Sequence, residues 1–181
     1  MILLIGINKE SLHDYEFVKP IEDIIHNLKL KFITKNYKNV TDKDISNSEK
    51  IIICGTSLLD FDYLIPENFS KFFWIRDYKK PLLGICGGMQ IVTKIFNGTL
   101  KKSKEIGLIK VLLKRDIFGI NGFLESYSLH GLRVNKIPKG FDVVGSSKKG
   151  SEIIQSKNIS CFLFHPEVRN KEIIENFVLK S

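Results

Sequence analysis

The feature that most constrains the fold of this chain is a Gly-x-Cys-x-Gly pattern at the end of a short apolar run, in the segment Pro81–Gln90. Leu82–Ile85 predicts a buried strand, and the residues that follow Cys86 have helical spacing. A nucleophile at such a strand-to-helix turn sits on a strained backbone, the nucleophile elbow, and the glycines leave room because they carry no Cβ. The N-terminus of the following helix favours a thiolate. We therefore predict that Cys86 is a nucleophile.

The first half of the chain alternates short apolar runs with helical patterns. Such runs, rich in β-branched residues, are typical of strands that are buried on both faces. They are Ile2–Ile7, Leu30–Thr34, Ile51–Cys54 and Leu82–Ile85. Apolar residues at helical spacing predict helices over residues 18–28, from Pro66 onward, and after Cys86 as far as Asn97. Strands that alternate with helices predict βαβ units and a mainly parallel sheet.

The second half of the chain has a different sequence pattern, with short predicted strands separated by turns that contain Gly, Pro, Asn and Ser. These strands are Ile106–Leu113, Leu132–Asn135, Asp142–Gly145, Glu152–Gln155 and Ile159–Phe164, and a helix is predicted from Lys171. We therefore expect one α/β domain over residues 1–181. Its sheet is predicted to be open and mainly parallel, with helices on both faces and a smaller antiparallel extension in the second half.

Composition argues against several classes of protein. Of the 181 residues, 43% are apolar and 27% are charged, which is ordinary for a globular domain. No apolar run is long enough to span a membrane, and the N-terminus lacks the basic start of a secretory signal, so we expect no membrane partner. Three widely spaced cysteines without a CxxC pair argue against a disulfide framework and for the reducing cytoplasm.

The net charge of +8 raises the question of a nucleic-acid partner. The lysines are scattered and flank turns or element ends, and no stripe of interleaved aromatic residues accompanies them, so we expect no nucleic-acid partner. A docking face for an acidic partner protein stays open. The four histidines lack the spacing of metal ligands, so no metal site is expected.

A second motif lies near the C-terminus, where the apolar run Phe162–Phe164 leads directly into His165-Pro166-Glu167. A thiol nucleophile needs a base, and the base needs an acceptor that orients its other ring nitrogen. His165 can be the base and Glu167 the acceptor, while Pro166 makes the spacing between them rigid. Together with Cys86, these residues predict a Cys–His–Glu triad.

The motifs Gly-Ile-Cys-Gly-Gly-Met-Gln and Phe-His-Pro-Glu-Val, in this order and at this separation, resemble those of the class I (triad-type) glutamine amidotransferases. The resemblance covers essentially the whole chain. It implies a flavodoxin-like sheet and an enzyme that hydrolyses the side-chain amide of L-glutamine through a γ-glutamyl thioester, without a cofactor. It also implies that Cys86 is the nucleophile, that His165 is the base and acid, and that Glu167 orients His165.

The same resemblance suggests which residues bind glutamine. Gln90, one helical turn after the cysteine, corresponds to a glutamine-binding side chain of the family. The segment Ser128–Leu132 resembles the family segment whose main chain receives the α-amino and carboxylate groups of glutamine. Gly131 and Leu132 are therefore expected to bind through their backbone, with His130 beside them in the binding segment and not as a catalytic residue.

One loop departs from the family pattern. Members usually carry Gly-Gly-Pro at the end of the third strand, where a backbone N–H helps to form the oxyanion hole, and this chain has Gly55-Thr56-Ser57 there. A backbone donor does not require glycine, so the N–H of Thr56, preceded by Gly55, can serve beside the N–H of Gly87. If the loop needs a positive φ, however, threonine is unfavourable in it.

The leading functional prediction is a free-standing glutaminase subunit that releases ammonia to a separate synthetase chain. Within the family, the compact size and the Glu-Val ending followed by a helix are most similar to the separate amidotransferase subunit of GMP synthase. Leu129–Leu132 also resembles the small subunit of carbamoyl-phosphate synthetase, and Gly87-Gly88 resembles the cobyric-acid type. Two alternatives stay open: a stand-alone γ-glutamyl hydrolase or transferase, and a non-catalytic regulatory subunit that retains the fold.

Overall fold

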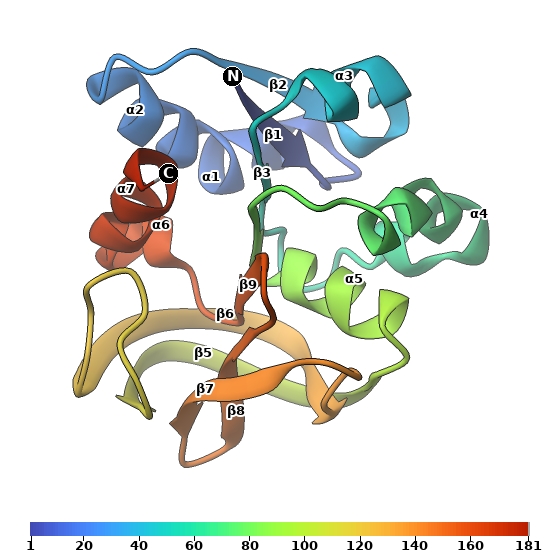
Figure 1. Ribbon diagram of the computed structural model, residues 1–181. Coiled ribbons are helices and arrows are strands. Elements are labelled where there is room, and N and C mark those ends of the chain that lie inside the picture. The colour runs from blue at the N-terminus through green and yellow to red at the C-terminus, as the bar shows by residue number, and fades with distance from the viewer. Residues whose placement is uncertain (181) are drawn as a thin grey trace.

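Nine strands form one open, mixed sheet in the computed structural model, which describes residues 1–180 (Figure 1). They are β1 (Ile2–Gly6), β2 (Phe32–Asn36), β3 (Lys50–Ile53), β4 (Leu82–Ile85), β5 (Thr99–Leu113), β6 (Phe123–Lys136), β7 (Asp142–Ser147), β8 (Gly150–Gln155) and β9 (Ile159–Phe162). Their order across the sheet is β2-β1-β3-β4-β9-β8-β7-β5-β6. The predicted α/β sheet with an antiparallel extension in the second half is confirmed.

The apolar runs of the first half form the parallel part of the sheet. β2, β1, β3, β4 and β9 pair in parallel, in a register that places Leu3 beside Ile51 and Ile51 beside Leu82. All three residues are buried, because helices cover both faces of this part of the sheet. Successive side chains point to opposite faces, so Leu4 packs into one core cluster and Leu3 into the other.

Two groups of helices cover the sheet, one on each face (Figure 1). The α-helices are α1 (Asp14–Phe17), α2 (Lys19–Asn27), α3 (Asp42–Asn47), α4 (Pro66–Phe69), α5 (Gly87–Ile95), α6 (Pro166–Arg169) and α7 (Lys171–Leu179), and 3₁₀ turns span Ser11–His13, Tyr37–Asn39, Asp62–Leu64 and Ser70–Arg76. Ile21 of α2 and Phe177 of α7 pack into one core cluster, and Met89 of α5 packs into the other. Within residues 1–180, no helix is both long and apolar enough to cross a membrane.

β5 and β6 are longer than predicted. The sequence predicted strands over Ile106–Leu113 and Leu132–Asn135, whereas the structure pairs Thr99–Leu113 with Phe123–Lys136 in antiparallel register. The additional residues mix Lys, Ser and Glu with single apolar residues, so main-chain pairing extends these strands beyond their continuous apolar stretches. β6 lies at the edge of the sheet and passes close to the end of β9, which brings the two halves of the chain together (Figure 1).

Two further elements differ in detail from the prediction. The strand expected over Ile159–Phe164 ends at Phe162 and lies between β4 and β8, parallel to the first and antiparallel to the second. It therefore joins the two parts of the sheet and places the residues after it next to the end of β4. The helix expected from Pro66 changes to 3₁₀ geometry at Ser70, a distinction that apolar periodicity alone does not make.

Candidate active site

Cys86 forms the turn between β4 and α5 with φ 47° and ψ −99°, a conformation that residues with a side chain rarely adopt. Glycines make it possible: a Cβ at Gly84 would lie 2.9 Å from the main chain of Gly88, and a Cβ at Gly88 would lie 2.6 Å from the carbonyl oxygen of Ile53. The N–H of Cys86 donates to the carbonyl of Phe162 in β9 at 2.7 Å. The strained turn expected from the sequence is therefore present and is anchored to the neighbouring strand.

His165 follows β9 and is held from three sides. Its backbone N–H donates to the carbonyl of Tyr127 at 2.8 Å, and its ring Nδ1 lies 2.7 Å from Oε1 of Glu167 in α6. Its ring packs against Phe17, with 5.4 Å between the ring centroids. His165 and Glu167 are both buried. A carboxylate only accepts hydrogen bonds, so Nδ1 carries a proton and Nε2 is the ring nitrogen left for chemistry.

The carbonyl oxygen of Leu129 in β6 contacts both of these candidate catalytic side chains. It lies 3.5 Å from Sγ of Cys86 and 3.3 Å from Nε2 of His165. A carbonyl oxygen only accepts, so the contact favours a proton on Nε2. Burial lowers the pKa of His165, but the Glu167 carboxylate and the Cys86 sulfur outweigh it and raise the pKa well above its usual value. No sequence pattern reveals this contact, because it involves a main-chain atom.

Gly55 and Thr56 follow β3 and lie against the elbow. A Cβ at Gly55 would lie 2.6 Å from Cε1 of His165, so the absence of a side chain is what lets the ring lie there. Thr56 is buried, its hydroxyl donates to Oδ2 of Asp60 at 3.1 Å, and its methyl carbon lies 3.3 Å from the position of a Cβ at Gly87. Neither Gly55 nor Thr56 has a positive φ, so the strain considered for threonine does not arise. As the first residue of α5, Gly87 has no intrahelical partner for its N–H.

Two of the four residues predicted to bind glutamine line a groove of about 520 Å³. Gly131 and Leu132 of β6 line this groove together with Phe61 from the loop that follows β3, and a Cβ at Gly131 would lie 3.2 Å from the Phe61 ring. Gln90 is buried in α5, where its Oε1 accepts from the hydroxyl of Tyr63 and its Nε2 donates to the carbonyl of Leu132 at 3.2 Å. The Gln90 amide therefore supports the strand that lines the groove. No role was predicted for Tyr63 from the sequence.

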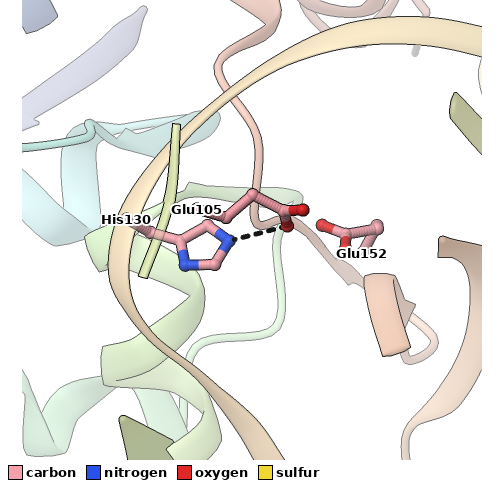
Figure 2. A group of neighbouring side chains, drawn as sticks. All are labelled: Glu105, His130 and Glu152. Atoms are coloured by element: carbon pink, nitrogen blue, oxygen red, sulfur yellow. Dashed lines mark ion pairs between the residues drawn. The ribbon is translucent and has the colours of Figure 1, made fainter. Parts of the chain in front are cut away.

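The side chain of His130 turns into a buried cluster of charged residues (Figure 2). Its Nε2 faces Oε2 of Glu105 at 3.6 Å, and burial together with the charge of Arg133 lowers its pKa to about 4. The Arg133 guanidinium donates to Glu105 at 3.0 Å and to Glu152 at 2.8 Å, and Nζ of Lys149 lies 3.1 Å from Oε1 of Glu105. The His130 side chain thus faces this cluster, and the groove is lined by its neighbours in β6.

Glu105, His130 and Glu152 offer ligand atoms that lie within 4.8 Å of one another, a spacing that is compatible with a metal ion. The spacing of the histidines in the sequence did not indicate this group, because its members come from three strands, β5, β6 and β8. In this structure the Arg133 guanidinium binds both carboxylates and neutralises charge that a metal ion would need. The group is therefore a buried ion-pair network.

Two sequence comparisons relate the chain to known proteins. The family model "Glutamine amidotransferase class-I" matches residues 12–181. The chain is 33% identical over 144 residues to the GMP synthase (glutamine-hydrolyzing) of Thermotoga petrophila, a match that covers 75% of this chain and 28% of that protein. The chain therefore spans little more than a quarter of the length of this curated relative.

Two solved structures have a similar fold. A candidate GMP synthase subunit from Thermoplasma acidophilum superposes with a TM-score of 0.83 at 18% sequence identity, over 98% of this chain and 92% of that chain. A glutamine amidotransferase from Thermotoga maritima superposes with a TM-score of 0.76, also at 18% identity, over 92% of this chain and 76% of that chain. At these identities the similarity concerns the fold alone.

Proposed function

The chain belongs to the class I glutamine amidotransferase family, and on that premise we propose that it releases ammonia from L-glutamine through Cys86, His165 and Glu167. The observation that carries the proposal is that the elbow cysteine and the glutamate-bound imidazole meet at one carbonyl oxygen, that of Leu129. A thiol on a strained turn, an oriented imidazole and nearby backbone donors are what acyl transfer requires.

The proposed reaction has two halves. The Cys86 thiolate attacks the carboxamide carbon, the N–H groups of Gly87 and Thr56 stabilise the resulting oxyanion, and Nε2–H of His165 protonates the amide nitrogen as the C–N bond breaks. Ammonia leaves, and a γ-glutamyl thioester remains on Cys86. Neutral Nε2 then takes a proton from water, hydroxide adds to the thioester carbon, and collapse of the adduct expels the thiolate and frees glutamate. Glu167 keeps Nδ1–H bound throughout.

Glutamine is proposed to enter through the groove beside β6. Its α-amino and carboxylate groups would meet main-chain atoms of Gly131 and Leu132, while Gln90 holds Leu132 from behind. Because the His130 side chain faces the charged cluster, the part proposed for His130 is limited to its backbone in the binding segment. When glutamine binds, its carboxamide would replace the Leu129 carbonyl as the partner of the His165 Nε2–H.

The proposed ammonia acceptor is a GMP-synthase-like synthetase on a separate chain. Supporting a synthetase of this kind, a relative at 33% identity is a GMP synthase (glutamine-hydrolyzing), and one structure with a similar fold is a candidate GMP synthase subunit. The proposed compartment is the cytoplasm. All three cysteines, Cys54, Cys86 and Cys161, are buried and free, which supports a reducing compartment.

Reaction with a diazoketone analogue of glutamine tests the proposed function. We expect one adduct per chain, located on Cys86 by peptide mass spectrometry and prevented by excess glutamine. Cys54 and Cys161 serve as internal controls, because burial raises the pKa of both thiols and keeps them protonated. If Cys86 stays unmodified both alone and with a GMP synthetase chain present, the proposal is wrong. Faster turnover of γ-glutamyl amines than of glutamine would favour the hydrolase alternative.

Replacing Glu167 with glutamine is expected to shift the pH dependence of the reaction. The variant keeps an acceptor for Nδ1–H but removes the negative charge that raises the pKa of His165 against the effect of burial. The imidazolium that protonates the leaving amide nitrogen is then lost at lower pH. We expect the alkaline limb of the kcat/KM profile to move to lower pH and kcat to fall by roughly 10²-fold.

Glu172→Gln in α7 removes the same charge away from the site and is the matched control for this measurement. Its pH profile of kcat/KM should superpose on that of the wild type. If the alkaline limb of Glu167→Gln lies at the same pH as that of the wild type, Glu167 does not set the protonation of His165.

A further inference from the structure

The β5–β6 ribbon is apolar on the face that points away from the core. Ile106 and Leu108 of β5 are 53% and 59% exposed, and Phe123 of β6 is 78% exposed. The register aligns their partners on the same face, since Ile106 pairs with Leu129 and Leu108 with Tyr127. We name this surface the outward apolar face, and it consists of Ile106, Leu108, Leu112, Phe123, Tyr127 and Leu129.

The folding of this chain does not account for the outward apolar face. The alternate residues of the same strands already supply the core, because Ile109, Val111 and Leu124 are buried in it. An antiparallel ribbon that buries one face usually presents polar residues on the other. The outward apolar face has two apolar groups, Ile106, Leu108, Tyr127 and Leu129 on one side of the Lys110–Glu125 pair and Leu112 and Phe123 on the other. Exposed apolar groups of this kind are typical of a surface that another protein covers.

The charges on this face indicate what kind of protein fits it. Lys104 and Lys110 occupy outward positions of β5 in alternation with the apolar residues, and Lys114 follows directly after the strand. Within the described residues of β5 and β6, Glu125 is the one exposed carboxylate on this face. It already forms an ion pair with Arg169. A second copy of the chain would bring lysines against lysines. A partner with an apolar centre and acidic residues around it is complementary.

The outward apolar face is also continuous with the candidate active site. The side chain of Leu129 belongs to the face, while its carbonyl oxygen contacts Cys86 and His165. Tyr127, two residues earlier, accepts the backbone N–H of His165 through its own carbonyl. The β6 part of the outward apolar face and the carbonyls that contact Cys86 and His165 therefore belong to the same strand, with no other element between them.

We propose that the outward apolar face is the docking surface for the synthetase chain, a protein whose contact region has an apolar centre and an acidic rim. This proposal rests on the proposed function, because the synthetase is the partner assigned there.

Binding of the separately produced GMP synthetase chain from the same organism tests the surface. We expect Leu108→Lys to raise the Kd at least about 10-fold, because it places a charge in the apolar centre. Leu179→Lys in α7 is the matched control, since Leu179 is 56% exposed against 59% for Leu108, and its Kd should stay at the wild-type value. Lys110→Glu should also weaken binding and flatten the dependence of Kd on salt.

The labelling experiment on the chain alone separates failure of this proposal from failure of the proposed function. A protein that labels on Cys86 but binds the synthetase chain equally well as wild type and as Leu108→Lys overturns the docking surface and leaves the glutaminase intact. Light scattering would also overturn the docking surface if it showed that the chain self-associates and that Leu108→Lys abolishes this self-association. The face would then bind a second copy of the chain. Unchanged urea unfolding of Leu108→Lys shows that loss of binding is not loss of folding.

Discussion

Cys86→Ala is expected to lower the glutaminase kcat by at least about 10⁴-fold, because no other group can form the γ-glutamyl thioester. The proposed binding groups at Gly131 and Leu132 are untouched in the variant, so we expect glutamine still to bind and KM to change little. Alanine also lacks only the sulfur, so the turn keeps its shape. The rate is measured as glutamate released under saturating glutamine, with the synthetase chain present and absent.

Cys161→Ala provides the comparison for this prediction. Cys161 lies in β9 next to the elbow strand and is equally buried, but burial raises the pKa of its thiol and leaves it unreactive. The folded variant should retain a kcat within a few-fold of wild type, although it loses some stability. A Cys86→Ala protein with more than about a hundredth of the wild-type rate would place the nucleophile elsewhere.

Arg133→Met is expected to lower the free energy of unfolding by about 3–5 kcal/mol. Arg133 is 1% exposed and binds the carboxylates of Glu105 and Glu152, which are themselves buried. Methionine fills much of the same volume but leaves two buried negative charges without their shared cation. Urea unfolding followed by circular dichroism measures the difference.

Two further variants show whether charge is the cause of this loss. Glu105→Gln and Glu152→Gln, combined with Arg133→Met, neutralise both carboxylates that lose Arg133 and should recover most of the lost stability. Lys149→Met removes an ion pair whose lysine is 54% exposed, so we expect about 1 kcal/mol or less. If the variant with all three substitutions is as unstable as Arg133→Met, the stability comes from the packing of the arginine side chain and not from its charge.

Much of the fold could be predicted from local patterns. The apolar runs over Ile2–Ile7, Ile51–Cys54 and Leu82–Ile85 became parallel strands because a strand buried on both faces needs apolar residues at every position. β5 and β6 were predicted too short for the opposite reason. Their outer residues are held by main-chain pairing across the ribbon, which side-chain type records only weakly.

In the candidate site, too, contacts between residues close in the sequence could be predicted, and contacts between distant strands could not. The geometry around Cys86 and the contact between His165 and Glu167 follow from residues within two positions of each other, and both were expected from the sequence. The catalytic roles of these residues stay predictions until they are tested. His130 was grouped with the glutamine-binding segment by its neighbours, but β6 turns its side chain toward Glu105 instead (Figure 2).

Local sequence is enough to predict the elbow at Cys86, the His165-Pro166-Glu167 turn and the parallel strands beneath them. Each depends on backbone sterics and apolar spacing over a few neighbouring residues. Three features come from the packing of distant segments: the Leu129 carbonyl contacts both Cys86 and His165, Arg133 binds two carboxylates, and one face of the β5–β6 ribbon leaves apolar side chains exposed. These features depend on strand register, and register is set by pairing between segments far apart in the chain.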